Sequence, residues 1–207
     1  MIVVLGRPGL APQREDGARP PGGLAALIAL HAAGRGATVE LVGAIGDDAS
    51  GDTVAIALGR AGVGHAALLR DPAGTTPVAG GPVGRPLPRL EAADVELGLR
   101  YLSDCRVIVV ADALDEAAAA ATMDAAGYHG APVVVVMDPG ASVPAAWERG
   151  ATVLLAPDPD AHDPDDDDPV PFAGFVAGFA VALADGVPAR EALARAATGG
   201  GWERAAE

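Results

Sequence analysis

Apolar and polar positions along the chain follow an alternation of short aliphatic runs and longer alanine-rich segments. The aliphatic runs are rich in valine and are four to eight residues long in their apolar part, which indicates strands buried on both faces. The alanine-rich segments carry apolar residues at helical spacing, and several of them end at a glycine. Strands are predicted within 1–6, 37–46, 106–114, 131–140 and 151–158, and helices within 22–36, 48–63, 115–130, 142–150, 170–186 and 187–201.

Strands that alternate with helices predict a parallel sheet covered by helices on both faces. A chain of 207 residues with 50% hydrophobic content can bury one such core, so we expect a single α/β/α domain over 1–207. The segment 157–169 is an exception, because aspartates and prolines fill it almost completely. We expect this segment to form an acidic loop that is exposed to solvent.

Charge and composition exclude several kinds of partner and of catalytic chemistry. The formal net charge is −14, which repels phosphate backbones and anionic lipid, so nucleic acid and membrane surfaces are not expected partners. The chain has no lysine, which excludes a P-loop lysine and a Schiff base. The single cysteine, Cys105, has no partner for an internal disulfide and is expected to be a buried apolar residue. Without a leader or a long apolar run, a cytoplasmic location is expected.

Four stretches resemble the ribokinase, or PfkB-type, family of carbohydrate kinases, and they occur in the order found in that family. The segment 20–63 is similar to its first signature, with Gly22 and Gly23 opening a helix and a G-x-x-G-D-D-x-x-G-D turn at 43–52. The segment "VVVVMDPG" is similar to the strand that ends in Asp-Pro, here Asp138, and "LLAPDPD" to the strand before Pro-Asn-x-x-Glu. The segment "GFVAGFAVALADG" is similar to the helix after the Gly-Ala-Gly-Asp signature.

The resemblance implies a ribokinase-like three-layer α/β/α fold with a mostly parallel central sheet. It also implies phosphoryl transfer from ATP, with Mg²⁺, to a hydroxyl of a sugar or nucleoside. The segment between Gly6 and Pro21 is too short for the usual lid strands, so the lid is expected to be reduced or absent. A small-molecule pocket is expected around Gly22, Gly23, Asp47 and Asp138.

The sequence departs from the family where the chemistry is expected. Aligning the helix places Ala173 at the position of the catalytic aspartate, and alanine cannot accept the proton of an attacking hydroxyl. Pro169 and Pro171 lack the N–H groups that would bind the transferring phosphate. Ala161 replaces the glutamate that helps to organise magnesium, and Leu27 replaces an asparagine of the first signature. No catalytic residue is therefore assigned.

The remaining acidic residues have two interpretations. Asp158 and Asp160 are candidate ligands for Mg²⁺ or Ca²⁺, since hard cations prefer carboxylate oxygens, although the segment equally suits a solvated acidic loop. Three further aspartates can either bind a ligand or cap the helix that begins near residue 50, namely Asp47, Asp48 and Asp52.

Three functions remain open at this stage. The first is a kinase-like protein with lost or vestigial phosphotransfer, a pseudokinase that retains a small-molecule pocket. The second is an interaction or scaffold subunit that keeps only the fold, and the third is an active minimal sugar or nucleoside kinase. A lost lid exposes sheet edge and apolar surface, which predicts a homodimer or a hetero-complex.

Overall fold

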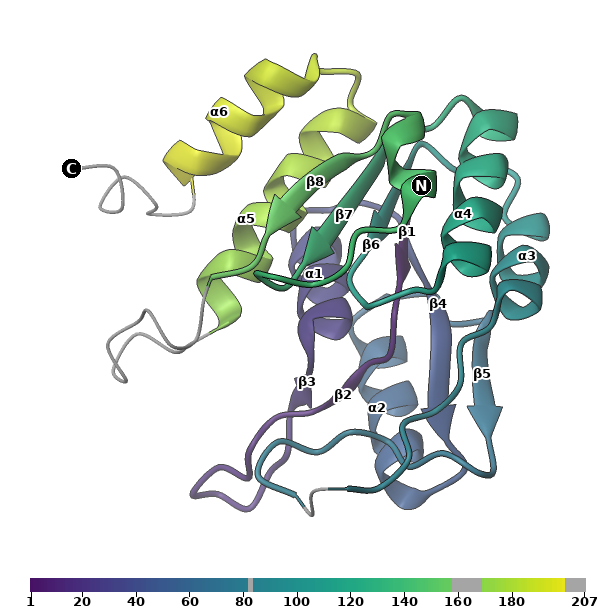
Figure 1. Ribbon diagram of the computed structural model, residues 1–207. Coiled ribbons are helices and arrows are strands. Elements are labelled where there is room, and N and C mark those ends of the chain that lie inside the picture. The colour runs from purple at the N-terminus through teal and green to yellow at the C-terminus, as the bar shows by residue number, and fades with distance from the viewer. Residues whose placement is uncertain (82–83, 158–168, 200–207) are drawn as a thin grey trace.

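Six parallel strands form one central sheet in the computed structural model, which describes residues 1–81, 84–157 and 169–199 (Figure 1). Their order across the sheet is β5-β4-β1-β6-β7-β8, and every neighbouring pair is parallel. The strands are β1 (Ile2–Leu5), β4 (Val39–Gly46), β5 (Leu68–Asp71), β6 (Val107–Val110), β7 (Val133–Met137) and β8 (Thr152–Leu155).

The central strands are buried on both faces, as their valine-rich sequences predict. Every residue of β1 and of β6 is buried, and successive side chains point alternately into the two hydrophobic cores above and below the sheet. Because all six strands are parallel, their carboxyl ends lie at one edge of the sheet. The chain adds strands to one side of β1 first and then continues on the other side at β6, so the direction of winding reverses between β1 and β6.

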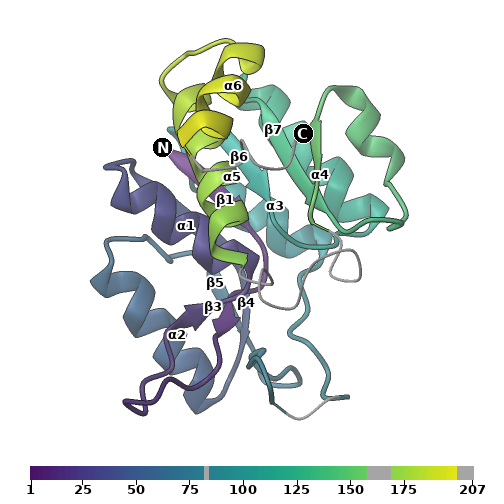
Figure 2. The same cartoon turned by 90° about the vertical axis from the view of Figure 1, so that its left-hand side faces the viewer.

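One face of the sheet is covered by helices α1 (Leu24–Gly34), α2 (Ala49–Arg60), α5 (Pro169–Ala184) and α6 (Ala189–Gly199) (Figure 2). Helix α5 lies between α1 and α6 and packs closely against both. Phe172 and Phe179 are buried, and Phe175 and Leu183 pack against the same core, so the expected apolar stripe of this helix is confirmed. Small residues let the helices approach, since a side chain at Gly178 would contact Ala196 of α6.

The other face is covered by α3 (Ala92–Arg100), α4 (Glu116–His129) and the 3-10 helix η1 (Ala145–Arg149). Trp147 of η1 is 3% exposed and belongs to this second core. The carboxylate of Glu116 accepts the N–H groups of Ala145 and Ala146 at 2.8 and 3.0 Å, which ties η1 to α4. Cys105 is buried as expected, and burial raises the pKa of its thiol to about 11, so it is chemically inert at neutral pH.

The expected α/β/α fold with a parallel central sheet is confirmed, and the structure adds elements that the sequence pattern did not indicate. These are β5, α3 and a two-stranded antiparallel sheet of β2 (Gly9–Leu10) and β3 (Pro21–Gly22). The pair β2–β3 lies in the segment where the family resemblance would place a lid, and each strand has only two residues. Within the described residues, no helix combines the length and the apolar character needed to cross a membrane.

Candidate functional site

The carboxyl ends of β1 and β6 meet at the point where the winding of the sheet reverses, which is where open α/β sheets usually bind ligands. In this chain an ion pair occupies that point. The backbone N–H and Nε of Arg7 donate to Oδ2 of Asp112 at 2.9 and 2.6 Å, and a second guanidinium nitrogen of Arg7 contacts Oδ1. The hydrogen bond to Asp112 raises the pKa of Arg7 against the opposing effect of burial.

The ion pair leaves little of either group free. The side chains of Arg7 and Asp112 are 21% and 14% exposed. Oδ1 of Asp112 also accepts the N–H of Ala113 at 2.8 Å, so each carboxylate oxygen has two donors. Because its lone pairs are already used, Asp112 is poorly placed to accept a further proton or to bind a ligand.

The turn after β4 contains Asp48, and both of its carboxylate oxygens are used in structural hydrogen bonds. Asp48 is the N-cap of α2, and its two carboxylate oxygens accept the N–H groups of Gly51 at 2.8 Å and Thr76 at 2.9 Å. Partial burial by itself raises the pKa of Asp48, but these hydrogen bonds outweigh that effect and the pKa lies below its usual value. Thr76 is 1% exposed and accepts the N–H of Gly46 at 2.9 Å, so the turn is fastened to a second loop.

The other two aspartates of this turn face an arginine. Arg70, at the end of β5, donates to Asp52 at 2.6 Å and lies 3.7 Å from Asp47. All three side chains are more than 40% exposed, so solvent screens these pairs. Asp52 lies in the first turn of α2, where a negative charge suits the helix dipole. The capping interpretation therefore holds for Asp48 and partly for Asp52, whereas Asp47 remains an exposed residue paired loosely with Arg70.

Gly22 and Gly23 open α1 under tight backbone constraints. A Cβ at Gly22 would lie 2.5 Å from the backbone nitrogen of Ala11, and Gly23 has a φ of 77°, in the left-handed region. Both glycines are thus needed for the entry into the helix and for the contact with the neighbouring loop.

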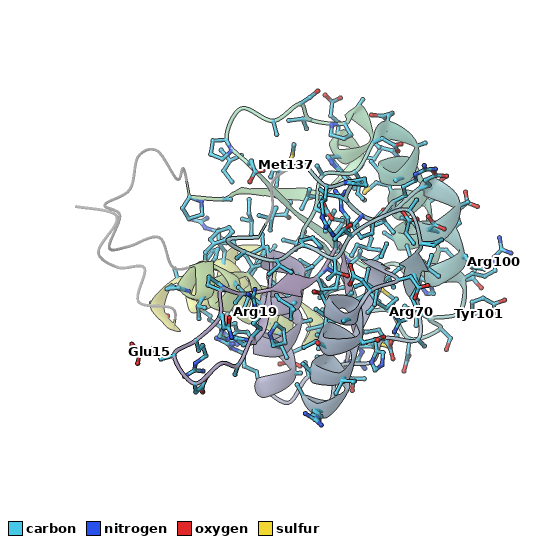
Figure 3. The ribbon with its side chains drawn as sticks, turned by 90° about the horizontal axis from the view of Figure 1, so that it is seen from below. Glu15, Arg19, Arg70, Arg100, Tyr101 and Met137 are labelled. Atoms are coloured by element: carbon cyan, nitrogen blue, oxygen red, sulfur yellow. The ribbon has the colours of Figure 1, made fainter. Side chains whose placement is uncertain are left out.

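Asp138 follows β7 and lines a pocket of about 240 Å³ at the carboxyl ends of β6 and β7. Trp147, Leu24 and Asp112 also line it. Gly22, Gly23 and Asp47 are not among the lining residues. β4 and β7 are three strand spacings apart, about 14 Å between the strands, so Asp47 and Asp138 lie on the same edge of the sheet but after strands that are not neighbours. Figure 3, which views the molecule from below, labels Arg70, which lies near Asp47, and Met137, which precedes Asp138, in different parts of the molecule.

Ala173 lies in the second turn of α5 and is completely buried in the core on the α1 face of the sheet. The first turn of α5 contains no acidic residue. A Cβ at the next position, Gly174, would lie 4.0 Å from the imidazole ring of His31 in α1, which shows how closely the two helices pack here.

The residues expected to bind a metal lie outside the described part of the chain, since Asp158 and Asp160 fall in the gap at 158–168. Among the residues that the structure does describe, no group of three or more His, Cys, Asp or Glu side chains could hold a metal ion. The pocket beside Asp138 does not fit ATP, because its lining contains two carboxylates and no arginine or histidine to neutralise phosphate.

Sequence reasoning missed three residues at this edge, namely Arg7, Asp112 and Trp147. The sequence context of Asp112 could have indicated a site residue, because Asp112 comes directly after the apolar run "VIVVA" and so lies at the carboxyl end of a strand. Arg7 could have been recognised in the same way, because it directly follows "MIVVLG". Their pairing depends on β1 and β6 being neighbours, which only the sheet order reveals.

Comparison with known proteins gives structural matches only. No protein-family model matches the sequence, and no curated protein matches it. A PfkB protein from Polaromonas sp. JS666 superposes with a TM-score of 0.64 at 19% sequence identity, over 96% of this chain and 94% of that chain. An Arabidopsis thaliana ribokinase in complex with ribose and ATP superposes with a TM-score of 0.63 at 16% identity, over 96% of this chain and 90% of that chain. The chain therefore has the fold of the ribokinase, or PfkB-type, carbohydrate kinases.

Proposed function

We propose that this chain is a carbohydrate-kinase-like protein that has lost phosphotransfer and keeps a small-molecule pocket at the carboxyl edge of its sheet. The observation that carries this proposal is Ala173. It lies where the family resemblance expects the general base, it has no carboxylate, and it is fully buried against neighbouring core residues. The first turn of α5 therefore offers no carboxylate to accept the proton of a hydroxyl, and loss of a general base alone lowers a rate by about 10²–10⁴-fold.

The ion pair of Arg7 and Asp112 supports the same proposal. It fills the reversal point of the sheet with two groups that satisfy each other, so neither is free to bind phosphate or to accept a proton. The pocket beside it has no basic lining residue, which removes the electrostatic stabilisation that phosphoryl transfer needs. The absent base on α5 and the absence of a basic lining residue both support the proposed loss of phosphotransfer.

The proposal is tested by measuring ADP release from Mg²⁺-ATP in the presence of a panel of sugars and nucleosides. We expect no substrate-dependent release above background, even with micromolar protein. Asp112→Asn serves as a second arm, because Asp112 is the one carboxylate near the reversal point that is largely shielded from solvent. Substrate-dependent release that disappears in Asp112→Asn would replace the proposal with the minimal-kinase alternative.

A second candidate function is an interaction subunit, and the edge strand β8 favours it. Within the described residues no strand pairs with the outer side of β8, and Val153 and Leu155 on one of its faces are 40% and 65% exposed. An exposed, uncharged strand edge is a surface on which another chain can pair.

Light scattering at micromolar concentration tests this second candidate. We expect a dimer or larger species that Leu155→Glu converts to monomer, because a charge on the edge opposes strand pairing. Leu97→Glu is the matched control, since Leu97 is 45% exposed on α3 and lies away from β8. A monomer for the wild type, with no partner captured from the native host, would exclude the interaction function.

A further inference from the structure

We infer that the pocket at the carboxyl ends of β6 and β7 selects a small primary amine over neutral or anionic molecules of the same shape, an inference that rests on the proposed function. Its basis is the combination of apolar walls, one exposed carboxylate that has no partner among the described residues, and a lining without basic residues. Each of these features is set by described residues of this chain.

The walls of the pocket are mainly apolar. Leu24, Leu114, Val135, Met137 and Trp147 contribute to its lining, and they come from α1, from β7 and from the segments that follow β6 and β7. An apolar cavity of about 150 Å³ can hold benzene, so a volume of about 240 Å³ suits a ligand of roughly ten non-hydrogen atoms. Such a ligand is a compact ring or short chain, well below the size of a nucleotide.

The two carboxylates of the pocket differ in what they can still bind. Asp112 is neutralised by Arg7, and both of its oxygens already have two donors. Asp138 is exposed, and no described residue donates a hydrogen bond to its side chain or lies within ion-pair distance of it. Its only described hydrogen bond uses the backbone carbonyl, which accepts the N–H of Ala141. Asp138 therefore provides the free negative charge at the rim of the pocket.

The charges around the pocket favour a cation beside Asp138. The lining contains Asp112 and Asp138 and no arginine or histidine, and the chain as a whole carries a formal charge of −14. An ammonium group can pair with Asp138 while its apolar body contacts Leu24 and Trp147. A carboxylate or phosphate of the same size would meet like charge, and a neutral alcohol would gain only an ordinary hydrogen bond.

The experiment uses three ligands that share a cyclohexane ring and differ in charge at pH 7. They are cyclohexylamine, which is cationic, cyclohexanol, which is neutral, and cyclohexanecarboxylate, which is anionic. Binding is followed by the fluorescence of Trp147, which lines the pocket, in a Trp202→Phe background where it is the only tryptophan. We expect the amine to bind about three- to fivefold more tightly than the alcohol, the scale of one solvent-exposed ion pair, and the carboxylate to bind most weakly.

Two variants locate the preference. Asp138→Asn keeps the shape of the side chain and removes its charge, so amine and alcohol should bind equally. Asp185→Asn is the matched control, because Asp185 is an exposed aspartate beyond the end of α5 and is absent from the lining of this pocket. The preference for the amine should persist in this control.

The outcomes separate this inference from the proposal on which it rests. Equal binding of amine and alcohol by the wild type would overturn the amine preference and leave a pocket without phosphotransfer. A preference that survives Asp138→Asn would also overturn the inference, as would no binding by any of the three ligands at millimolar concentration. Substrate-dependent ADP release, measured separately, would instead overturn the proposed loss of phosphotransfer.

Discussion

The turn after β4 and the start of α5 both resemble kinase signatures, but they differ in which residues are present. In the turn, Asp48 caps α2 and binds the N–H of Thr76, and Gly46 and Gly51 are packed against other backbone atoms. In α5, the packing residues Phe179 and Gly178 are present, whereas Ala173 lies at the position where the resemblance expects the catalytic aspartate. The residues that match the family signatures are thus the ones that cap a helix or pack against neighbouring atoms in this fold.

This difference separates the residues that identify the fold from those that an activity would need. A glycine with a backbone atom at its Cβ position, or an aspartate with two N–H donors, cannot be exchanged without loss of stability. A catalytic base in an exposed site carries no such penalty. A motif of structural residues therefore identifies this fold, while the activity has to be argued from the site itself.

The largest effect on stability is expected from Ala173→Asp, the substitution that restores the missing carboxylate. Ala173 is fully buried among apolar residues, so an unpaired charge there should lower the free energy of unfolding by about 3–5 kcal/mol. Urea unfolding measures this, and Ala194→Asp on the exposed side of α6 is the control, with an expected change below about 1 kcal/mol. A loss of similar size in both variants would mean that Ala173 is not enclosed as described.

The next largest effect is expected from Gly43→Ala in β4, at the first glycine of the signature. A Cβ at Gly43 would lie 1.8 Å from the carbonyl oxygen of Gly6, and this oxygen belongs to the backbone, so it cannot rotate away. We expect a loss of about 2–3 kcal/mol, typical of an overpacked core.

Gly127→Ala provides the control for this substitution. Gly127 lies in α4 with no atom within 4 Å of its Cβ position, and alanine should stabilise the helix there by about 0.5–1 kcal/mol. A tolerated Gly43→Ala would show that the close approach of β1 and β4 is not required.

A smaller effect, with a pH signature, is expected for Asp48→Asn. Asparagine keeps one acceptor oxygen, so the N–H of either Gly51 or Thr76 loses its partner, at a cost of about 1–2 kcal/mol at pH 7. Because the pKa of Asp48 is lowered in the folded state, its contribution is present above the unfolded-state value of about 3.9 and is lost as the pH falls through the lower folded-state value.

Unfolding free energies measured from pH 7 down to pH 2 test this signature. The difference between the wild type and Asp48→Asn should shrink below about pH 4. A difference that stays constant over the whole range would show that the charge of Asp48 does not contribute.

The smallest effects are expected for Asp47→Asn and Asp52→Asn. Both carboxylates pair with Arg70 in solvent, so each substitution should change the free energy of unfolding by less than about 0.5 kcal/mol, and high salt should reduce the change further. A cost above about 1 kcal/mol for Asp47→Asn would indicate a stronger role than the structure assigns to it.

The sequence indicated the layered fold because buried parallel strands have an unmistakable composition, as in β1 and β7. It did not indicate β5, whose residues "LLRD" are only partly buried, or α3, which has no alanine-rich signature. At the edge of the sheet, Asp138 was predicted and does line a pocket, while the pairing of Arg7 with Asp112 was not. That pair joins residues 105 positions apart, and local patterns carry no information on such a distance.

The measurement that tests the central claim most directly is transfer of the γ-phosphoryl group of labelled ATP to sugar or nucleoside under single-turnover conditions, with protein in excess over ATP. The wild type should transfer no label above a protein-free control. Ala173→Asp should not transfer label either, because the pocket offers no group that binds phosphate. Labelled product from the wild type, or its appearance in Ala173→Asp at a rate about 10²-fold or more above the wild type, would contradict the account.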